Sequence, residues 1–550
     1  MLKVFVFCSS VLLFFSCKKE SSTSNTTTET EIKNDTIRLD TVAKDFREFR
    51  VTDSKIINMD SLWMPFEKDL ALLTKERYEE LKPFILEKDI PTLQKYIAQE
   101  EFTYEELTLF YLYRIREFDR NNPKSLNAVI SLNPEALKTA RILDASEVRI
   151  APYSIFGMPM LIKDNINTKE LPTTAGAVAL INNKTDDAFI IDRLREKGAI
   201  ILGKANLSEW AYFFCGDCPS GYSAVGGQTF NPYGRRTIDT GGSSSGSGVA
   251  VAANFCVAAV GTETSGSILS PSSQNSVVGL KPTVGLLSRS GIIPISGTLD
   301  TPGPMAKSVT DAAIVLQSMV GIDVKDKASA DSPEVKEFYV NGLSQASLKG
   351  KRFGFFKELA SDSLYSRALD TLRSAGVSLI ELEAPEKELK DFIRLLNLDM
   401  KKDLPAYFSK YGSKDLEVTT IEEIISYNKS DSMARSPYGQ KLFQGIMSDT
   451  GTQQELEVIK DSLFIKGETF FSVPIKKHNL DAILSINNYH AGFAAVARYP
   501  AITVPMGYTK KNEPEGLTII TTPFNEEKLL QWAYRFEQVS GFRKFPSEYR

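Results

Sequence analysis

Two serine- and glycine-rich stretches contain the residues of this chain that are most able to do chemistry. The first runs from Gly241 to Gly248 and contains Ser243, and the second runs from Gly261 to Ser267. Far upstream, a third segment ends an apolar run with Lys163. Serine hydroxyls held in glycine turns, with an amine as the available strong base, indicate acyl-transfer chemistry that does not need histidine.

The run from Met158 to Ile162 predicts a buried strand, so the Lys163 that follows it should be at least partly desolvated. Desolvation disfavours the ammonium form, lowers the pKa of the amine and allows it to act as a base. The alternative is a lysine that pairs with neighbouring Asp164 and points to solvent. The serine stretches also have alternatives, namely a flexible loop, a helix N-cap or an ordinary strand-to-loop turn.

Histidine is scarce, since only His478 and His490 occur. Neither has the neighbours typical of a Ser-His-Asp triad or of a metal site. We therefore expect both to be surface or packing residues, and we expect no metal and no cofactor.

The composition argues against nucleic acid as a partner, and it does not decide whether two nearby cysteines form a disulfide. The chain has 550 residues, a net charge of −4 and no basic stripe, so nucleic-acid binding is not expected. Cys215 and Cys218 form a Cys-Gly-Asp-Cys segment, which would be a local disulfide or two free thiols in a loop.

The first residues predict export. Residues 1–16 combine a positive start with an apolar run too short to span a bilayer, which indicates a secretory signal peptide. The small Ser16 before Cys17 resembles a bacterial lipoprotein processing site, at which Cys17 would be lipidated; an ordinary cleaved signal is the alternative. Residues 17–45 predict a flexible polar tether. We thus expect a protein anchored to a membrane by lipid, in the periplasm or at the cell surface.

The remaining residues, 46–550, predict one large α/β domain in which helices bury a sheet. Helical spacing at 90–97 and 104–115, with a capped start at Thr103, alternates later with short apolar strands and a helix at 249–253. Examples of those strands are expected at residues 158–162, 199–203, 257–261 and 277–280, and β-rich sequence returns at 482–521. The domain divides into a helical N-terminal part, a core, a helical insertion with one strand at 352–356, and a C-terminal core part, at residues 46–150, 151–310, 311–475 and 476–550.

Several longer motifs, in their order along the chain, resemble those of the amidase signature family. They cover residues 157–165, 241–244, 261–268, 278–283, 300–305, 499–505 and 516–518. The likeness runs from about residue 100 to the C-terminus and looks closest to the bacterial peptide-amidase branch. It implies a fold with a mixed central sheet flanked by helices on both faces.

The resemblance also implies a Ser–cis-Ser–Lys triad. In it Ser267 is the nucleophile, Ser243 the bridging serine and Lys163 the base. The implied activity is hydrolysis of a linear carbon–nitrogen bond through an acyl-enzyme, for instance at a peptide C-terminal amide. An esterase or carbamate hydrolase with the same site and a non-catalytic lipoprotein that binds amides or peptides are the alternatives.

Further residues around this triad follow from the same resemblance. The peptide bond between Gly242 and Ser243 is expected to be cis, and Ser244 is expected to support the site. The oxyanion would be held by the backbone amides of Thr264, Ser265, Gly266 and Ser267.

Overall fold

The computed structural model of the chain describes residues 49–148, 150–330, 339–384 and 388–550. The predicted signal peptide at 1–16, the predicted lipid attachment site Cys17 and the predicted tether at 17–45 lie outside these residues. The described residues belong to one unit, which runs from Thr36 to Arg550. In this part of the chain, no helix combines the length and the apolar character needed to cross a bilayer.

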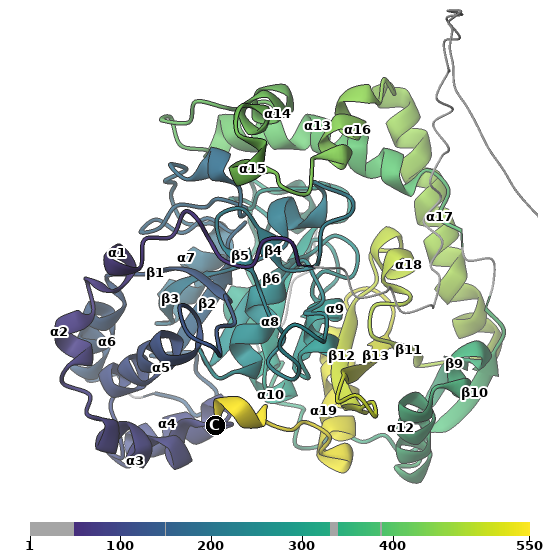
Figure 1. Cartoon of the computed structure of the whole chain (residues 1–550). Coiled ribbons are helices and arrows are strands. Elements are labelled where there is room, and N and C mark those ends of the chain that lie inside the picture. Colours follow the sequence, from purple (N-terminus) through teal and green to yellow (C-terminus); the bar gives the residue numbers. More distant parts are fainter. Residues whose placement is uncertain (1–48, 149, 331–338, 385–387) are drawn as a thin grey trace, which may run out of the picture. The chain divides into compact units, whose positions relative to one another are not determined.

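A large mixed sheet forms the centre of this unit (Figure 1). Its strands are β1 (Val129–Leu132), β2 (Pro159–Lys163), β3 (Ile200–Ala205), β6 (Ala258–Glu263), β7 (Val278–Lys281), β8 (Thr301–Ala306), β9 (Arg352–Phe356), β10 (Ser378–Leu382), β11 (Ala482–Ile486), β12 (Ala501–Tyr508) and β13 (Pro514–Ile520). Among the described residues the sheet has eleven strands, in the order β1-β3-β2-β6-β8-β7-β12-β13-β11-β9-β10. Strand β2 is parallel to β3 and β6, and β9 is parallel to β10 and β11. A separate short pair consists of β4 (Tyr222–Ser223) and β5 (Gly227–Gln228).

The central strands form where the sequence has short, continuous apolar runs. Every residue of β2, β3 and β6 is buried, including the polar residues at their ends. A strand that is covered on both faces does not need the polar–apolar alternation of a solvent-facing sheet. The four predicted core strands are confirmed as β2, β3, β6 and β7, with ends that differ by no more than two residues.

Helices occur in every part of the domain. The N-terminal part has α1 (Met59–Trp63), α2 (Glu67–Leu70), α3 (Lys75–Ile85), α4 (Ile90–Ala98), α5 (Tyr104–Phe118) and α6 (Ala136–Asp144). The core has α7 (Phe189–Glu196), α8 (Ser245–Ala252) and α9 (Leu269–Gln274), and α10 (Val309–Met319) begins at its end. The insertion has α11 (Lys327–Ala330), α12 (Ser363–Ser374), α13 (Phe392–Tyr411), α14 (Ile421–Ser430), α15 (Ser432–Arg435), α16 (Lys441–Ser448) and α17 (Gln453–His478), and the C-terminal part has α18 (Ala491–Val496) and α19 (Glu526–Ser540).

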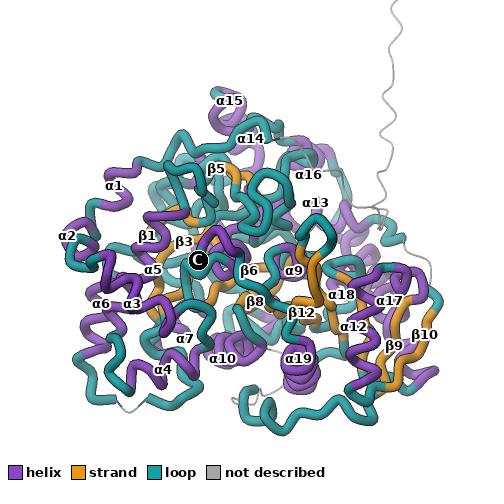
Figure 2. Tube along the Cα trace, turned by 60° about the horizontal axis from the view of Figure 1, so that its bottom comes forward, coloured by secondary structure: helices purple, strands orange, loops and turns teal. Residues whose placement is uncertain are grey.

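Helices cover both faces of the sheet, as the resemblance implied. Helix α8 packs on β2, β3 and β6, and α9 packs on β7, β12 and β13. Helices α10 and α19 pack against each other and lie side by side in Figure 2, and α10 packs on β6, β7 and β8 while α19 packs on β12 and β13. The predicted helix start at Thr103 is confirmed, since Thr103 and Glu106 form a capping box at the beginning of α5.

Strands β1 and β10 lie in parts of the chain that the sequence predicted to be helical. Strand β1 falls within the predicted helical part at 46–150, and β10 falls within the insertion, where only 352–356 was predicted as a strand. They form the two edges of the sheet. An edge strand needs no continuous apolar run: β1 has only four residues, and most of β10 is half-buried or exposed.

Candidate active site

Lys163 is the last residue of β2, at the end of the parallel strands β2, β3 and β6. The residue is fully buried, and its Nζ lies 2.8 Å from Oγ of Ser243 and 2.8 Å from Oγ1 of Thr262. Nζ also donates to the carbonyl oxygen of Thr262 at 3.1 Å. No carboxylate of the described residues forms an ion pair with Lys163. The alternative of a solvent-facing lysine paired with Asp164 is therefore wrong.

Burial controls the protonation of this lysine. Desolvation lowers the pKa of the Lys163 amine to about 7, although the charges of Asp300 and Glu263 act in the opposite direction. At pH 7, about half of the amine is neutral. In that form Nζ can accept a proton from the hydroxyl of Ser243.

Asp164 has a different partner. It forms a buried ion pair with Lys204 of β3 at 3.4 Å and accepts hydrogen bonds from the amide and the hydroxyl of Thr174. Lys204 also donates to Oγ1 of Thr173 at 2.9 Å. Successive residues of an extended chain point to opposite sides. The carboxylate of Asp164 is thus directed away from the Lys163 amine.

Ser243 lies just before α8, and its position depends on close backbone packing. The peptide bond between Gly242 and Ser243 is cis, as the resemblance implied. The carbonyl oxygen of Ser243 accepts a hydrogen bond from the amide of Ser208 at 3.0 Å. A Cβ atom on Gly242 would lie 2.6 Å from Oγ of Ser208, so this approach requires glycine.

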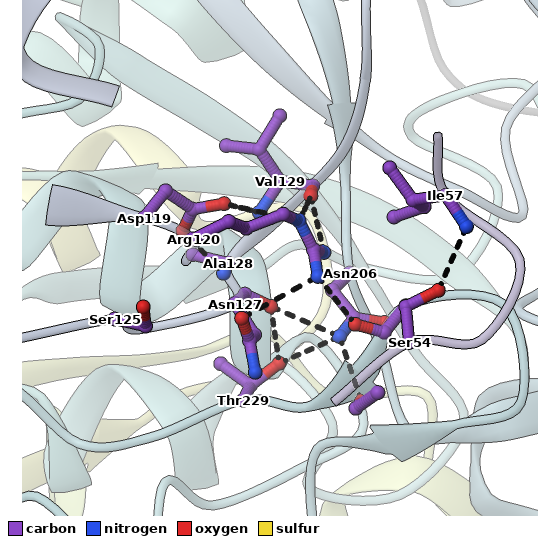
Figure 3. A network of polar contacts seen from close by, with 12 residues as sticks. Ser54, Ile57, Asp119, Arg120, Ser125, Asn127, Ala128, Val129, Asn206 and Thr229 are labelled. Carbon is purple, nitrogen blue, oxygen red and sulfur yellow. Dashed lines mark hydrogen bonds and ion pairs between the residues drawn. The ribbon is translucent and has the colours of Figure 1, made fainter. Parts of the chain in front are cut away.

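A polar network around Asn206 holds the beginning of α8 (Figure 3). Nδ2 of Asn206 donates to the carbonyl oxygen of Asn127 at 3.0 Å and to Oγ1 of Thr229 at 2.9 Å. The carbonyl oxygen of Asn206 accepts the amide of Gly246 at 2.9 Å. Because Gly246 belongs to the first turn of α8, this network connects the end of β3 to the loop that carries Ser243.

The two serine stretches meet at Ser244. Its amide donates to the carbonyl oxygen of Ser267 at 3.1 Å, and its hydroxyl donates to the carbonyl oxygen of Thr262 at 3.1 Å. Lys163 and Ser243 are completely buried, whereas Ser267 is 9% exposed. Lys163 thus contacts Ser243 directly, and the main chain of Ser267 is bonded to Ser244, the residue that follows Ser243.

Glu263, for which the sequence suggested no role, holds the turn from Thr264 to Ser267. Its carboxylate accepts the amides of Gly266 at 2.7 Å, Ile268 at 2.8 Å and Leu269 at 3.0 Å. The predicted oxyanion donor Gly266 is thus engaged by a side chain. An acidic residue at the end of an apolar strand was the signal that could have revealed this clamp.

The other three predicted oxyanion donors have no such partner. The amides of Thr264, Ser265 and Ser267 make no hydrogen bond to the described residues, so they can donate to an incoming carbonyl oxygen. The side chain of Thr264 is held by Asp300 in the loop before β8.

Asp300 is the second site residue that the sequence did not suggest. It accepts hydrogen bonds from Oγ1 of Thr264 at 2.5 Å and from the amide of Ser296 at 2.9 Å. Burial raises the pKa of Asp300 to about 6. A cavity of about 10 Å³, room for about one water, lies between Asp300, Asn165, Thr262 and Thr264. Its residues come from four distant segments, which explains why no local motif revealed it.

Helices of the insertion hold two sides of this site. Asp399 of α13 accepts a hydrogen bond from Oγ of Ser296 at 2.5 Å. The amide of Leu442 in α16 donates to the carbonyl oxygen of Phe214 at 2.9 Å. Phe214 follows closely after Ala211, which lines the same small cavity as Asp300. The insertion therefore contacts the loops on both sides of the cavity.

The cysteine and histidine residues take structural positions. Cys215 and Cys218 form a disulfide, which decides between the two alternatives left by the sequence. His490 is buried and packs against Phe356, with ring centroids 4.4 Å apart. His478 is the last residue of α17. In the described part of the chain, no group of three or more potential ligands could hold a metal ion.

The sheet and the serine–lysine site agree with the class that comparison with known proteins establishes. A family model described as amidase matches residues 106–457, and the chain belongs to the amidase family. It is therefore an amidase, an enzyme that hydrolyses amide carbon–nitrogen bonds.

Individual relatives extend over most of the chain. An amidase family protein from Bacillus anthracis has a similar structure, with a TM-score of 0.85 and 37% identity, over 90% of this chain and 99% of that one. The native peptide amidase from Stenotrophomonas maltophilia has a TM-score of 0.78 and 38% identity, over 84% and 98% of the two chains. A probable amidase of Arabidopsis thaliana is 36% identical over 480 residues, which cover 84% of this chain and 92% of the relative.

Proposed function

We propose that this amidase forms an acyl-enzyme on Ser267, with Ser243 and Lys163 as its proton relay. The observation that carries the proposal is the fully buried amine of Lys163, which lies 2.8 Å from Oγ of Ser243. An amine in this place is partly neutral at physiological pH because of its desolvation. A neutral amine can act as a general base, and an ammonium group cannot.

The reaction then proceeds in two halves. As Oγ of Ser267 attacks the amide carbon, its proton passes to Oγ of Ser243, whose own proton passes to Nζ of Lys163. Backbone amides of the turn stabilise the oxyanion. The relay returns a proton to the leaving nitrogen, and the carbon–nitrogen bond breaks to release ammonia or an amine. Water, deprotonated by the same relay, hydrolyses the ester to Ser267 and regenerates the hydroxyl.

A peptide C-terminal amide is the substrate class that we propose. The similarity to the peptide amidase of Stenotrophomonas maltophilia, at 38% identity over 84% of this chain, supports this choice. An ester or a carbamate would react through the same acyl-enzyme, so hydrolysis rates of matched amide and ester substrates distinguish these alternatives.

A fluorophosphonate probe tests the nucleophile. We expect the wild type to be labelled and Ser267→Ala to remain unlabelled, with Ser270→Ala, just beyond the turn, as a labelled control. Lys163→Met should be folded and should lose nearly all hydrolysis of a peptide amide. Full activity of Lys163→Met would refute the relay, and absence of labelling in the folded wild type would favour a non-catalytic binding protein.

We also propose that the enzyme is exported and anchored by lipid at Cys17. The support is the sequence of residues 1–17, with its positive start, its short apolar run and its small residue before the cysteine. The disulfide between Cys215 and Cys218 accords with an oxidising compartment. Metabolic labelling with a radioactive fatty acid in a bacterial host should mark the wild type and leave Cys17→Ala unlabelled. Equal labelling of both would refute the anchor.

A further inference from the structure

An asparagine beside the predicted nucleophile turn has a side chain with no structural partner. Asn488 lies in the loop between β11 and α18 and is half-buried. Its side chain covers Gly266, because a Cβ atom on Gly266 would lie 2.6 Å from Nδ2 of Asn488. The φ angle of Gly266 is +91°, so glycine suits this position for its conformation as well. The side-chain amide of Asn488 makes no hydrogen bond to the described residues.

The loop that carries Asn488 is held in place by its neighbours. The amide of Asn487 donates to the carbonyl oxygen of Gly516 at 2.9 Å, and Oγ1 of Thr518 donates to the carbonyl oxygen of Asn487 at 2.5 Å. The amide of Ala491 donates to the carbonyl oxygen of Asn488 at 3.0 Å. Main-chain contacts therefore position Asn488, and its carboxamide is not needed for the shape of the loop.

A second uncommitted polar group borders the same turn. The hydroxyl of half-buried Ser265 makes no hydrogen bond among the described residues. The start of α18 closes in on it, since a Cβ atom on Gly492 would lie 3.7 Å from Oγ of Ser265 and 3.1 Å from Cδ1 of Leu389. The surroundings of the turn thus combine a carboxamide, a hydroxyl and an apolar side chain.

We propose that Asn488 determines specificity by binding a second amide group of the substrate, adjacent to the scissile one. This inference rests on the proposed hydrolysis at Ser267. A carboxamide offers both a donor and an acceptor, and these complement the C=O and N–H of a peptide group. Substrates in which a peptide bond precedes the scissile amide gain this interaction. Simple alkyl or aryl amides do not.

Two substrates that differ mainly in this group provide the test. N-acetylphenylalaninamide and 3-phenylpropanamide share the phenyl ring and the scissile primary amide, but only the first has a second amide. We expect the wild type to prefer the first. Asn488→Ala and Asn488→Leu should each lower kcat/KM for the first by about tenfold, the effect of one lost hydrogen bond, and should leave the second unchanged. The exposed Asn182, replaced by alanine, is the matched control.

The leucine variant separates hydrogen bonding from packing, because it keeps the number and branching of the side-chain heavy atoms and removes their polarity. The inference would be overturned if Asn488→Leu preferred N-acetylphenylalaninamide as strongly as the wild type does, or if its kcat/KM fell equally for both substrates. Binding to Ser267→Ala, measured by calorimetry, needs no turnover. In this background, Asn488→Leu should weaken the binding of N-acetylphenylalaninamide by about tenfold and leave the binding of 3-phenylpropanamide unchanged. If that weakening occurs without wild-type hydrolysis of either amide, the proposed function fails and the inference stands. If it does not occur, the inference fails.

Discussion

The protonation of Lys163 should set the pH dependence of this enzyme. Only the neutral amine accepts a proton, so activity is lost as the pH falls through the pKa of Lys163. With that pKa at about 7, we expect kcat/KM to fall about tenfold per unit below pH 7 and to level off above pH 8. No alkaline decline from this residue is expected.

The burial of Lys163 sets the size of this effect. At the ordinary pKa of 10.5, about one amine in three thousand would be neutral at pH 7, whereas at a pKa of about 7 the fraction is about one half. Desolvation therefore increases the amount of available base about a thousandfold. The lowering of the Lys163 pKa from 10.5 to about 7 corresponds to a free energy on the order of 5 kcal/mol.

Asp300→Asn tests the electrostatic origin of this pKa. The charge of Asp300 raises the pKa of Lys163, so its removal should lower that pKa and move the acid limb of kcat/KM to lower pH. The asparagine oxygen can still accept the hydroxyl of Thr264, which contacts Asp300 in the wild type. Asp60→Asn, at an exposed position in α1, removes the same charge far from the site and should leave the profile unchanged.

The assay is the hydrolysis of a peptide amide between pH 5 and pH 9, at constant ionic strength, with thermal unfolding measured in parallel. An acid limb that stays in place in Asp300→Asn, or moves to higher pH, would refute the electrostatic account. A wild-type profile without any acid limb near pH 7 would refute the assignment of Lys163 as the base.

Three further substitutions probe the turn and the core. Glu263→Gln should lower kcat by one to two orders of magnitude with little change in KM, because the amides of the turn lose a charged acceptor; an unchanged kcat would contradict the clamp. Arg114→Met should lower the free energy of unfolding in urea by about 2–4 kcal/mol, since buried Arg114 donates to the carbonyls of Ala253 and Asn254; a loss below about 0.5 kcal/mol would show that these carbonyls find other donors. Replacing Cys215 and Cys218 together by serine should cost about 2 kcal/mol, the loop-closure value for so short a ring, and equal midpoints for oxidised and reduced wild type would argue against it.

Much of this architecture could be predicted from short-range sequence patterns. The apolar runs that form β2, β3, β6 and β7 are continuous because both faces of these strands are covered. Such runs can be recognised in the amino-acid sequence. Strand β10 escaped prediction because an edge strand with exposed side chains has no such run. Its pairing with β9 is visible only in the folded chain.

The residues of the site also divide into those that sequence motifs reveal and those that only the folded chain brings together. Lys163, Ser243 and Ser267 stand in motifs with distinctive glycines and could be named from the sequence. Asp300 and Asn488 could not, because their proximity to the turn arises from segments far apart in the chain. Asp300 begins the motif at 300–305, but that motif does not show that its carboxylate binds Thr264, and no motif contains Asn488, which covers Gly266.

The contacts of α13 and α16 with the loops beside the cavity suggest where this enzyme can be redesigned. Asp399 and Leu442 contact Ser296 and Phe214, whereas the lysine and both serines are held by the core alone. A library confined to the helices of the insertion would therefore vary the loops beside the cavity while Lys163, Ser243 and Ser267 keep their positions. The same separation would let related chains acquire new substrates by exchanging this segment, without rebuilding the chemistry beneath it.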